Sequence, residues 1–324
     1  MRGSGMSPTA LLRKLPAAIR VRDTLVRRLR RWLEEVEELS AEIPFDNRSD
    51  WIGMTLERFM QDPLCRAKAP YIWGVLQGCA LGKVLGLSRV SVMEFGVASG
   101  AGLLSLERIA ERAEKSIGIE IEVYGFDTGF GLPKPQDYRD CPNLWLDGQF
   151  PMDVEALSAR LRRTSLRLGL IKETVPAFLQ GGHAPVAFAA IDVDLYSSTK
   201  EVFQLFQGSY DRLLPRVVCY FDDIMGWTFN EYNGERLAIA EFNVEHAMRK
   251  ICPLHGLKYF VPTRHRNRAW PELMFLFHMF DHPLYDQHDV LRKPMLLDIN
   301  GNLADWRRTL NIPRHTAPGL SFSQ

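Results

Sequence analysis

Four aspartates stand at the ends of two apolar runs in this 324-residue chain. Asp192 and Asp194 end the first run, and Asp222 and Asp223 follow the second. Near-continuous apolar runs are typical of strands buried on both faces, and the carboxyl ends of neighbouring parallel strands meet at one edge of a sheet. Carboxylates crowded there repel one another, and their oxygens suit Mg²⁺ or Ca²⁺ far better than Zn²⁺. We predict a divalent metal site from this cluster. Helix capping or pairing with arginine is the alternative for any single aspartate.

A glycine-rich turn follows an earlier apolar run and precedes a helical segment. Glycines at such a place let the backbone turn tightly and approach a ligand beside a helix N-terminus. Gly96 and Gly100 lack the G-x-G-x-x-G spacing of dinucleotide-binding proteins. We predict that this turn binds a cofactor, with a tight turn that binds nothing as the alternative. The predicted cofactor residues of the turn are Glu94, Gly96, Val97, Ala98, Ser99 and Gly100.

Asp127 ends the next short apolar run and is followed by Thr128. An acid at the end of the second strand of a nucleotide-binding sheet commonly accepts hydrogen bonds from ribose hydroxyls. We therefore predict that Asp127 and Thr128 belong to the cofactor site. A helix cap or an Asx turn that involves Gly129 is the alternative.

The elements that must position these residues alternate between strand-like and helix-like patterns. This alternation predicts an α/β protein with a mostly parallel sheet covered by helices. The last two strands have no helix between them, so we expect an antiparallel hairpin at one edge. The predicted strands are Arg89–Val97, Val123–Phe126, Leu168–Lys172, Val186–Asp192, Val217–Phe221, Leu257–Val261 and Leu273–Phe280. The predicted helices are Val21–Leu39, a region over Trp51–Leu87, Ala101–Ala113, Val154–Leu166, Ser198–Leu213 and Glu235–Lys250.

Composition excludes several classes of protein. Hydrophobic residues make up 46% of the chain and charged residues 24%, which is ordinary for a globular protein. Lys and Arg number 40 against 39 Asp and Glu, so the total charge gives no footprint for nucleic acid or for an anionic membrane. No apolar run approaches the ~20 residues that cross a bilayer. The five cysteines are widely spaced and odd in number. We therefore expect neither a disulfide framework nor a zinc knuckle, and we expect a cytoplasmic location.

Five short motifs together resemble the macrocin O-methyltransferase family. Their order and spacing match over about residues 89 to 245, roughly half of the chain. The motifs are E-F-G-V-A-S-G at 94–100, G-F-D-T-G-F-G-L-P at 125–133, G-L-I-K-E-T-V-P at 169–176, D-V-D-L-Y-S-S-T at 192–199 and D-D at 222–223. The chain departs from the family at Phe130, at Leu214–Val217 and at Ile224, which puts the acceptor substrate in doubt more than the cofactor.

The resemblance implies a Rossmann-like class I methyltransferase fold with a seven-stranded sheet and S-adenosylmethionine as the methyl donor. It implies that Asp192, Asp222 and Asp223 hold Mg²⁺, and that the stretch with Glu173 and Thr174 lies over the adenine. The function implied is transfer of a methyl group to a hydroxyl of a small molecule, a sugar or a natural-product intermediate. Mg²⁺ there would chelate the acceptor oxygens and lower the pKa of the hydroxyl.

The general base stays open at this stage. His265, in the loop between the last two predicted strands, and Asp194 are the candidates, with Asp192 acting through the metal. A solvated histidine in a basic loop is an equally good interpretation of His265.

The sequence also suggests a domain organisation and an association state. We expect an N-terminal helical extension or lid over residues 1–88, a methyltransferase domain over 89–281 and a C-terminal tail over 282–324. The helix Val21–Leu39 has a basic first half and an acidic second half, so we predict an antiparallel self-contact and a homo-oligomer, with a solvated face as the alternative. Two other functions compete: a nucleotide-binding oxidoreductase and a non-catalytic binding protein that keeps the fold.

Overall fold

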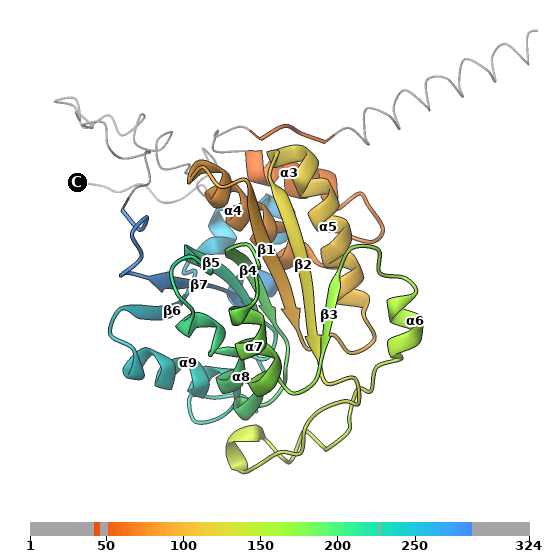
Figure 1. Cartoon of the computed structure of the whole chain (residues 1–324), viewed down its shortest axis with the longest axis vertical. Helices are drawn as coiled ribbons and strands as arrows, with labels where there is room; N and C mark the ends of the chain where they lie inside the picture. Colours follow the sequence, from red (N-terminus) through yellow and green to blue (C-terminus); the bar gives the residue numbers. More distant parts are fainter. Residues whose placement is uncertain (1–41, 46–50, 227, 287–324) are drawn as a thin grey trace, which may run out of the picture. The chain divides into compact units, whose positions relative to one another are not determined.

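The computed structural model describes residues 42–45, 51–226 and 228–286. The predicted helix Val21–Leu39 and most of the predicted tail lie outside these residues. The described elements belong to one compact unit that starts at Ile43 and is built around a seven-stranded sheet in the order β3-β2-β1-β4-β5-β7-β6 (Figure 1). The strands are β1 Arg89–Phe95, β2 Glu120–Asp127, β3 Ser165–Leu168, β4 Val186–Ile191, β5 Leu213–Phe221, β6 Arg249–Pro253 and β7 Met274–Met279.

The predicted fold class is confirmed. Strands β1 to β5 pair in parallel, and β7 runs antiparallel to both β5 and β6. This is a mostly parallel, Rossmann-like sheet with one reversed strand near its edge. All six residues of β4, at its centre, are buried, which explains the unbroken apolar run in the sequence.

Helices cover both faces of the sheet. One layer packs on β1, β2, β4 and β5 and holds α3 Trp51–Phe59, α4 Ala69–Val84 and α5 Ala101–Ile117. The other layer holds α7 Ile171–Gln180, α8 Tyr196–Val202 and α9 Gly234–Glu245 (Figure 1). The short helix α6, Val154–Ser158, precedes β3. No helix of the described residues is both long and apolar enough to cross a membrane.

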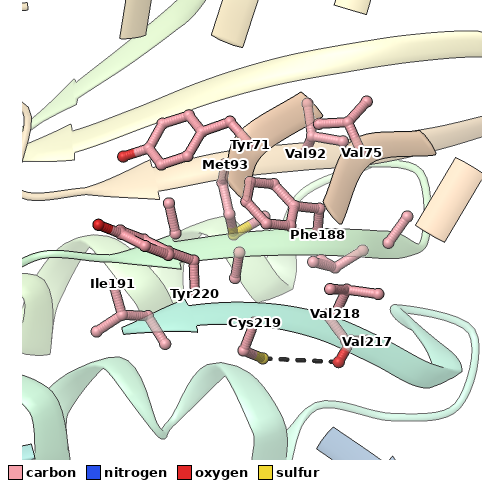
Figure 2. Packing of buried hydrophobic residues seen from close by; sticks show 14 of the residues in the cluster. Tyr71, Val75, Val92, Met93, Phe188, Ile191, Val217, Val218, Cys219 and Tyr220 are labelled. Atoms are coloured by element: carbon pink, nitrogen blue, oxygen red, sulfur yellow. Dashed lines mark hydrogen bonds between the residues drawn. The ribbon is translucent and has the colours of Figure 1, made fainter. Parts of the chain in front are cut away.

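A stripe of glycines lets α4 lie directly on the sheet. Gly74, Gly78 and Gly82 recur every fourth residue, so they share one face of the helix. A Cβ atom on any of them would overlap a sheet residue: the Phe188 ring, the Ala187 carbonyl group or the Val90 side chain, respectively. Figure 2 shows this core, in which Tyr71 and Val75 of α4 pack beside Val92, Phe188 and Tyr220.

Several predicted elements differ in place or length from the elements of the structure. The strand expected at Leu257–Val261 is β6, eight residues earlier, and 257–259 form a 3-10 turn. Charged Arg249 and Lys250 hide this edge strand in the sequence. The Arg249 guanidinium donates to the carbonyl oxygens of Phe206 and Gly208 at 2.7 and 2.9 Å.

The helix expected at Val154–Leu166 ends at Ser158. The residues expected to continue the helix bond to Glu107 of α5 instead. Its carboxylate accepts the backbone N–H groups of Arg162, Arg163 and Thr164 at 3.0–3.1 Å. The strand that follows is therefore Ser165–Leu168 rather than 168–172.

The remaining helix boundaries also differ from expectation. The helix expected at Ser198–Leu213 starts at Tyr196 and ends at Val202. A separate 3-10 turn, Leu205–Gln207, follows it, and Leu213 already belongs to β5. The helix expected to reach Lys250 ends at Glu245. The region expected over Trp51–Leu87 consists of the two helices α3 and α4.

Strand β6 forms one edge of the sheet, and α9 covers part of it. The Asn243 side chain accepts the backbone N–H of Ile251 at 2.8 Å and donates to the Ile251 carbonyl oxygen at 2.7 Å. Both backbone groups of a residue in an antiparallel strand point to the same side. Asn243 therefore occupies the side of Ile251 that faces away from β7.

Candidate active site

A cavity of about 340 Å³ opens at the carboxyl edge of the sheet. It brings together the ends of β1, β2, β4 and β5, as predicted from the apolar runs. Its polar residues are Asp127, Thr128, Gln149, Asp192, Asp194, Ser198, Glu201, Asp222 and Asp223. Its remaining lining is Gly96, Ala98, Phe126, Gly131, Leu132, Pro133, Trp145, Phe150, Ile171 and Val193.

The glycine turn joins β1 to α5 at the cavity. Gly96 has a φ of 79°, and a Cβ atom there would overlap the backbone carbonyl oxygen of Asp192. The close contact between the ends of β1 and β4 therefore requires a glycine at position 96, whether or not a ligand binds there. Gly100, with a φ of 84°, is the N-cap of α5, and no side chain caps that helix. The first N–H groups of α5 are left for a ligand or solvent.

Asp127 holds the glycine turn from the end of β2. Its Oδ2 atom accepts the N–H groups of Val97 at 2.8 Å and Ala98 at 3.0 Å, and its Oδ1 atom accepts the N–H of Gly129 at 2.7 Å. The Asx turn considered from the sequence is therefore present. Because each carboxylate oxygen has two acceptor positions and Asp127 lines the cavity, it can also accept a hydroxyl of a ligand.

Four aspartates form the acidic side of the cavity, as predicted. Burial and the neighbouring Asp222 carboxylate raise the pKa of Asp192 to about 7. Burial and Asp192 raise the pKa of Asp194 to about 7, and burial and Asp194 raise the pKa of Asp223 to about 7. The mutual repulsion expected of crowded carboxylates is thus present. Asp194 also has a φ of 61°, in the left-handed region that aspartate enters more readily than most residues other than glycine.

A fifth carboxylate, Glu235 of α9, lies behind the four and was not predicted. It is fully buried and accepts the backbone N–H of Asp223 at 3.0 Å. Burial and the Asp223 charge raise the pKa of Glu235 well above its usual range. Oδ2 of Asp223 and Oε1 of Glu235 are buried, and no donor among the described residues reaches them.

The donor set suits a hard cation, but the acids do not form a finished metal centre. All candidate ligands are carboxylate oxygens, and the unpartnered Asp223 oxygen is the kind of group that a cation would satisfy. Within the part of the chain that the structure describes, no three such groups have the spacing of a metal site.

Glu94 lies under the glycine turn and is 2% exposed. Tyr71 of α4 donates its hydroxyl to Oε1 of Glu94 at 2.6 Å, and the Lys68 ammonium group lies 4.6 Å from the Tyr71 ring. Burial raises the pKa of Glu94 to about 8, although Lys68 and Tyr71 act in the opposite direction. Glu94 does not line the cavity, so its expected cofactor contact is not direct in this structure.

The raised pKa of Glu94 predicts a stability that falls with pH. The folded state keeps a proton on Glu94 up to about pH 8, whereas the unfolded chain releases it near pH 4.5. Glu94 should therefore contribute a decrease of about 1.4 kcal/mol per pH unit to the free energy of unfolding between these values, and this contribution should level off above them. Urea denaturation at pH 5, 6, 7 and 8 measures this slope. Glu94→Gln should make it shallower by about one proton, and an unchanged slope would contradict the assignment.

Seven predicted site residues do not line the cavity: Glu94, Val97 and Gly100 of the glycine turn, and the four described next. Ser99 and Glu173 are exposed, and Thr174 turns its hydroxyl back to the Leu170 carbonyl oxygen at 3.2 Å. His265 is 4% exposed and packs beside Glu57 and Trp270 instead of in a solvated loop. None of the four is brought together with the aspartates.

Sequence reasoning missed the wall opposite the aspartates. The loop 128–153 supplies Leu132, Pro133, Trp145 and Phe150 to the cavity. It is closed at its base, where Leu132 N–H donates to the Gln149 carbonyl oxygen at 2.7 Å and Gly148 N–H to that of Leu132 at 2.8 Å. The backbone contact between Leu132 and Gln149, and the ring contact between Trp145 and Phe150 with centroids 6.2 Å apart, leave no helix or strand periodicity in the sequence. The matched motif ended at Pro133.

Another groove, of about 680 Å³, lies on the outer side of α5. Four of its six charged residues already have partners within the protein: Arg108 pairs with Asp62 at 2.8 Å and with Glu111 at 3.1 Å, and Glu107 accepts the N–H groups described above. We therefore assign the functional site to the smaller cavity at the strand ends.

Comparisons with known proteins found distant likenesses among solved structures only. No family model matches the chain, and no curated protein matches it. Among solved structures, the calicheamicin methyltransferase CalS11 is 22% identical over 63% of this chain and 88% of its own, with a TM-score of 0.41. Cofactor-bound Rv0187 from MTB is 16% identical over 68% of this chain and 90% of its own, with a TM-score of 0.37.

A third solved structure is the O-methyltransferase TomG from Streptomyces achromogenes, in complex with S-adenosylmethionine. It is 13% identical over 75% of this chain and 94% of its own, with a TM-score of 0.35. These are distant likenesses, and the fold assignment rests on the strand order and directions given above. The resemblance to the macrocin family itself stays a prediction from the motifs.

Proposed function

We propose that this chain is an S-adenosylmethionine-dependent O-methyltransferase that acts on a hydroxyl group of a small molecule. The observation that carries the proposal is the two-sided cavity at the strand ends. One side has the glycine turn and Asp127, which suit a nucleoside, and the other has four carboxylates, which suit a polar acceptor. Methyl transfer from a sulfonium needs this separation, because the acceptor oxygen must approach in line with the methyl group.

The donor side is assigned from the chain's own contacts. Asp127 and Thr128 face the ribose hydroxyls, and the apolar side chains of Phe126 and Ile171 enclose the adenine. The uncapped N-terminus of α5 faces the donor's carboxylate. Ile171, at the start of α7, takes the place over the adenine that the sequence assigned to Glu173 and Thr174.

The acceptor side is assigned to the aspartates. Asp192, Asp222 and Asp223 would hold Mg²⁺ there if their carboxylates drew closer together than they lie in this structure. Mg²⁺ bound there would lower the pKa of an acceptor hydroxyl. The carboxylates themselves orient the acceptor oxygens and exclude bulky apolar groups from that side. Asp194, whose pKa of about 7 suits proton transfer near neutrality, is the general base in this proposal. His265 has no part in it, because it does not reach the cavity.

The acceptor class is the finer part of the proposal. A sugar or a natural-product intermediate with neighbouring oxygens would present the two donors that a chelated cation needs. The macrocin-like motifs support this class, and the departures at Phe130 and Ile224 leave the particular acceptor to experiment.

Isothermal titration calorimetry tests the donor assignment directly. We expect one S-adenosylmethionine or S-adenosylhomocysteine molecule to bind per chain, and we expect NAD to give no heat of binding. Binding of NAD without S-adenosylmethionine would support the oxidoreductase alternative instead. Donor binding without turnover on any polyol, sugar nucleotide or phenolic diol would support a non-catalytic binding protein.

A further inference from the structure

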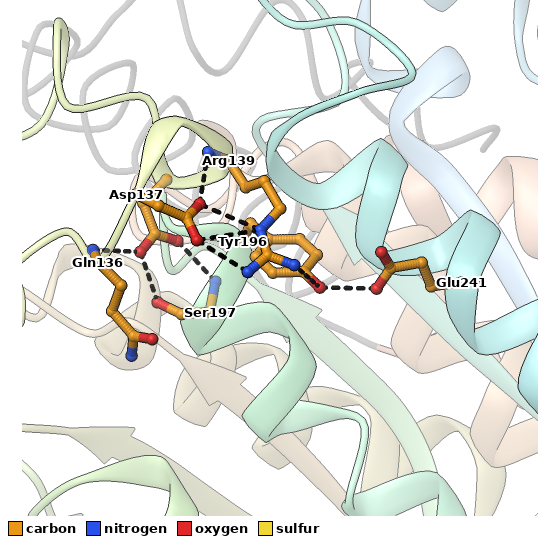
Figure 3. Close-up of polar contacts among 7 residues, drawn as sticks. Gln136, Asp137, Arg139, Tyr196, Ser197 and Glu241 are labelled. Carbon is orange, nitrogen blue, oxygen red and sulfur yellow. Dashed lines mark hydrogen bonds and ion pairs between the residues drawn. The ribbon is translucent and has the colours of Figure 1, made fainter.

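One buried carboxylate links two walls of the cavity. These are helix α8, which supplies Ser198 and Glu201, and the loop 128–153, which supplies Trp145 and Phe150. Asp140, on the loop 128–153, is 1% exposed. Its Oδ1 atom accepts the backbone N–H of Ser197 at 2.7 Å, and its Oδ2 atom accepts the Ser197 hydroxyl at 3.0 Å and the N–H of Gln136 at 2.8 Å. Figure 3 shows the loop residues facing Ser197 and Tyr196 at the start of α8.

Helix α8 has no side-chain cap within its own segment. Its N-cap is Leu195, which cannot accept a hydrogen bond through its side chain. Ser197 is the second residue of α8, so Asp140 satisfies an N–H group that the helix leaves open. The helix starts two residues after Asp194, and its Ser198 and Glu201 line the cavity. The position of α8 therefore affects both the acidic side and the floor of the site.

A second contact, between Arg139 and Tyr196, also joins the loop 128–153 to α8. The Arg139 guanidinium lies 4.6 Å from the Tyr196 ring centre and donates to the Tyr196 hydroxyl at 3.1 Å. That hydroxyl donates to Glu241 of α9 at 2.6 Å, as Figure 3 shows. Arg139 itself is exposed enough to tolerate substitution, and it pairs with Asp137 at 2.8 Å. Asp140 is the buried member of this network.

The same arrangement is repeated at the next helix. Helix α7 also has no side-chain cap of its own, and Glu201 of α8 accepts the N–H of Lys172 in its first turn at 3.1 Å. Ile171, which lines the cavity, is the neighbour of Lys172. A displacement of α8 would therefore move both Glu201 and the start of α7.

We propose that Asp140 is a positioning residue that sets the width of the cavity, and through it the affinity for the methyl donor. It touches neither reacting atom. It acts by fixing α8 against the loop that carries Trp145 and Phe150. The inference rests on the proposed function only in naming S-adenosylmethionine as the ligand, because the link between the two walls is present without it.

The experiment compares Asp140→Ala with Asp153→Ala in the full chain. Asp153 is a matched control, since it also caps a helix by accepting the N–H of Ala156 at 3.0 Å, but helix α6 does not line the cavity. We expect Asp140→Ala to weaken S-adenosylmethionine binding at least tenfold by calorimetry at 20 °C. Asp153→Ala should change it less than twofold, even where both variants lose similar thermal stability.

Two milder variants keep the inference testable if Asp140→Ala does not fold. Ser197→Ala removes only the hydroxyl and should weaken donor binding two- to threefold, with little added effect in the Asp140→Ala background. Asp140→Asn keeps one acceptor oxygen and should recover part of the affinity. Equal affinity of Asp140→Ala and the wild-type protein would overturn the inference.

Hydrogen exchange separates this inference from the proposed function. Amide exchange at residues 196–199 should accelerate at least tenfold in Asp140→Ala and not in Asp153→Ala. If the wild-type protein binds no S-adenosylmethionine, the proposed function fails. Unchanged exchange at 196–199 would overturn the positioning role in that case, and accelerated exchange would uphold the link between the walls.

Discussion

Replacing Asp222 with asparagine should abolish the response of this protein to Mg²⁺ while donor binding persists. Asp222 lies on the acidic side of the cavity and accepts the Tyr220 hydroxyl, a contact that asparagine can keep. A cation on three carboxylates is worth several kcal/mol in a reaction of this type, so turnover should fall by about 10² or more. Affinity for S-adenosylmethionine should change less than threefold, because the donor lies on the glycine side.

Three measurements check this prediction. Thermal shift with and without Mg²⁺ reports the metal independently of turnover, and the stabilisation should be absent in Asp222→Asn. Exhaustive chelation of the wild-type protein should mimic the substitution, and Mg²⁺ or Mn²⁺ should reverse it. Asp147→Asn, an exposed acid on the loop 128–153, is the control. Full turnover after chelation would show that the aspartates act without a metal, as a base or as structural groups.

Asp127→Ala should reduce donor affinity about a hundredfold. It removes the acceptor of three backbone N–H groups and the proposed acceptor of the ribose hydroxyls. Hydrogen bonds to a charged group contribute about 1.5–3 kcal/mol each, and 1.4 kcal/mol is a tenfold change in affinity. Calorimetry with S-adenosylhomocysteine measures the loss.

Glu173→Gln is the informative comparison for Asp127→Ala. The sequence assigned Glu173 to the cofactor, but the structure places it on the exposed side of α7, so its substitution should leave donor affinity unchanged. A larger loss in Glu173→Gln than in Asp127→Ala would mean that the donor lies outside the cavity. Gly96 is a poorer probe, since a side chain there would collide with the Asp192 backbone and disturb the fold itself.

The sequence alone predicted those features of the fold that depend on which stretches of the chain are buried. Strand β4 reads as an apolar run because both faces are covered, and the acids that follow it must emerge at the carboxyl edge of the sheet. The glycine turn, Asp127 and the four aspartates were placed together for this reason. The antiparallel direction of β7 was also predictable, because no helix lies between the last two strands.

The contacts that hold the site together depend on residues far apart in the sequence. Asp140 reaches Ser197, Glu201 reaches Lys172, and Glu235 reaches Asp223. In each contact a carboxylate accepts a backbone N–H of another element, so no spacing of residues along the sequence predicts the contact. The same cause misplaced the predicted helix at 154–166, where Glu107 satisfies backbone groups that were expected to be helical. His265 was misplaced because its loop folds back against α3 rather than over the strand ends.

The amide of Asn243 bears on how copies of this protein can associate. An incoming strand that sought to lengthen the sheet beyond β6 would find the N–H and carbonyl of Ile251 already engaged, at the middle of a five-residue strand. Such a strand would have to displace a bidentate amide before it gained its first hydrogen bonds. An oligomer of this chain that lengthened the sheet at β6 would have to pay this cost, so its interfaces should be sought first by cross-linking other surfaces rather than by mutating the β6 edge.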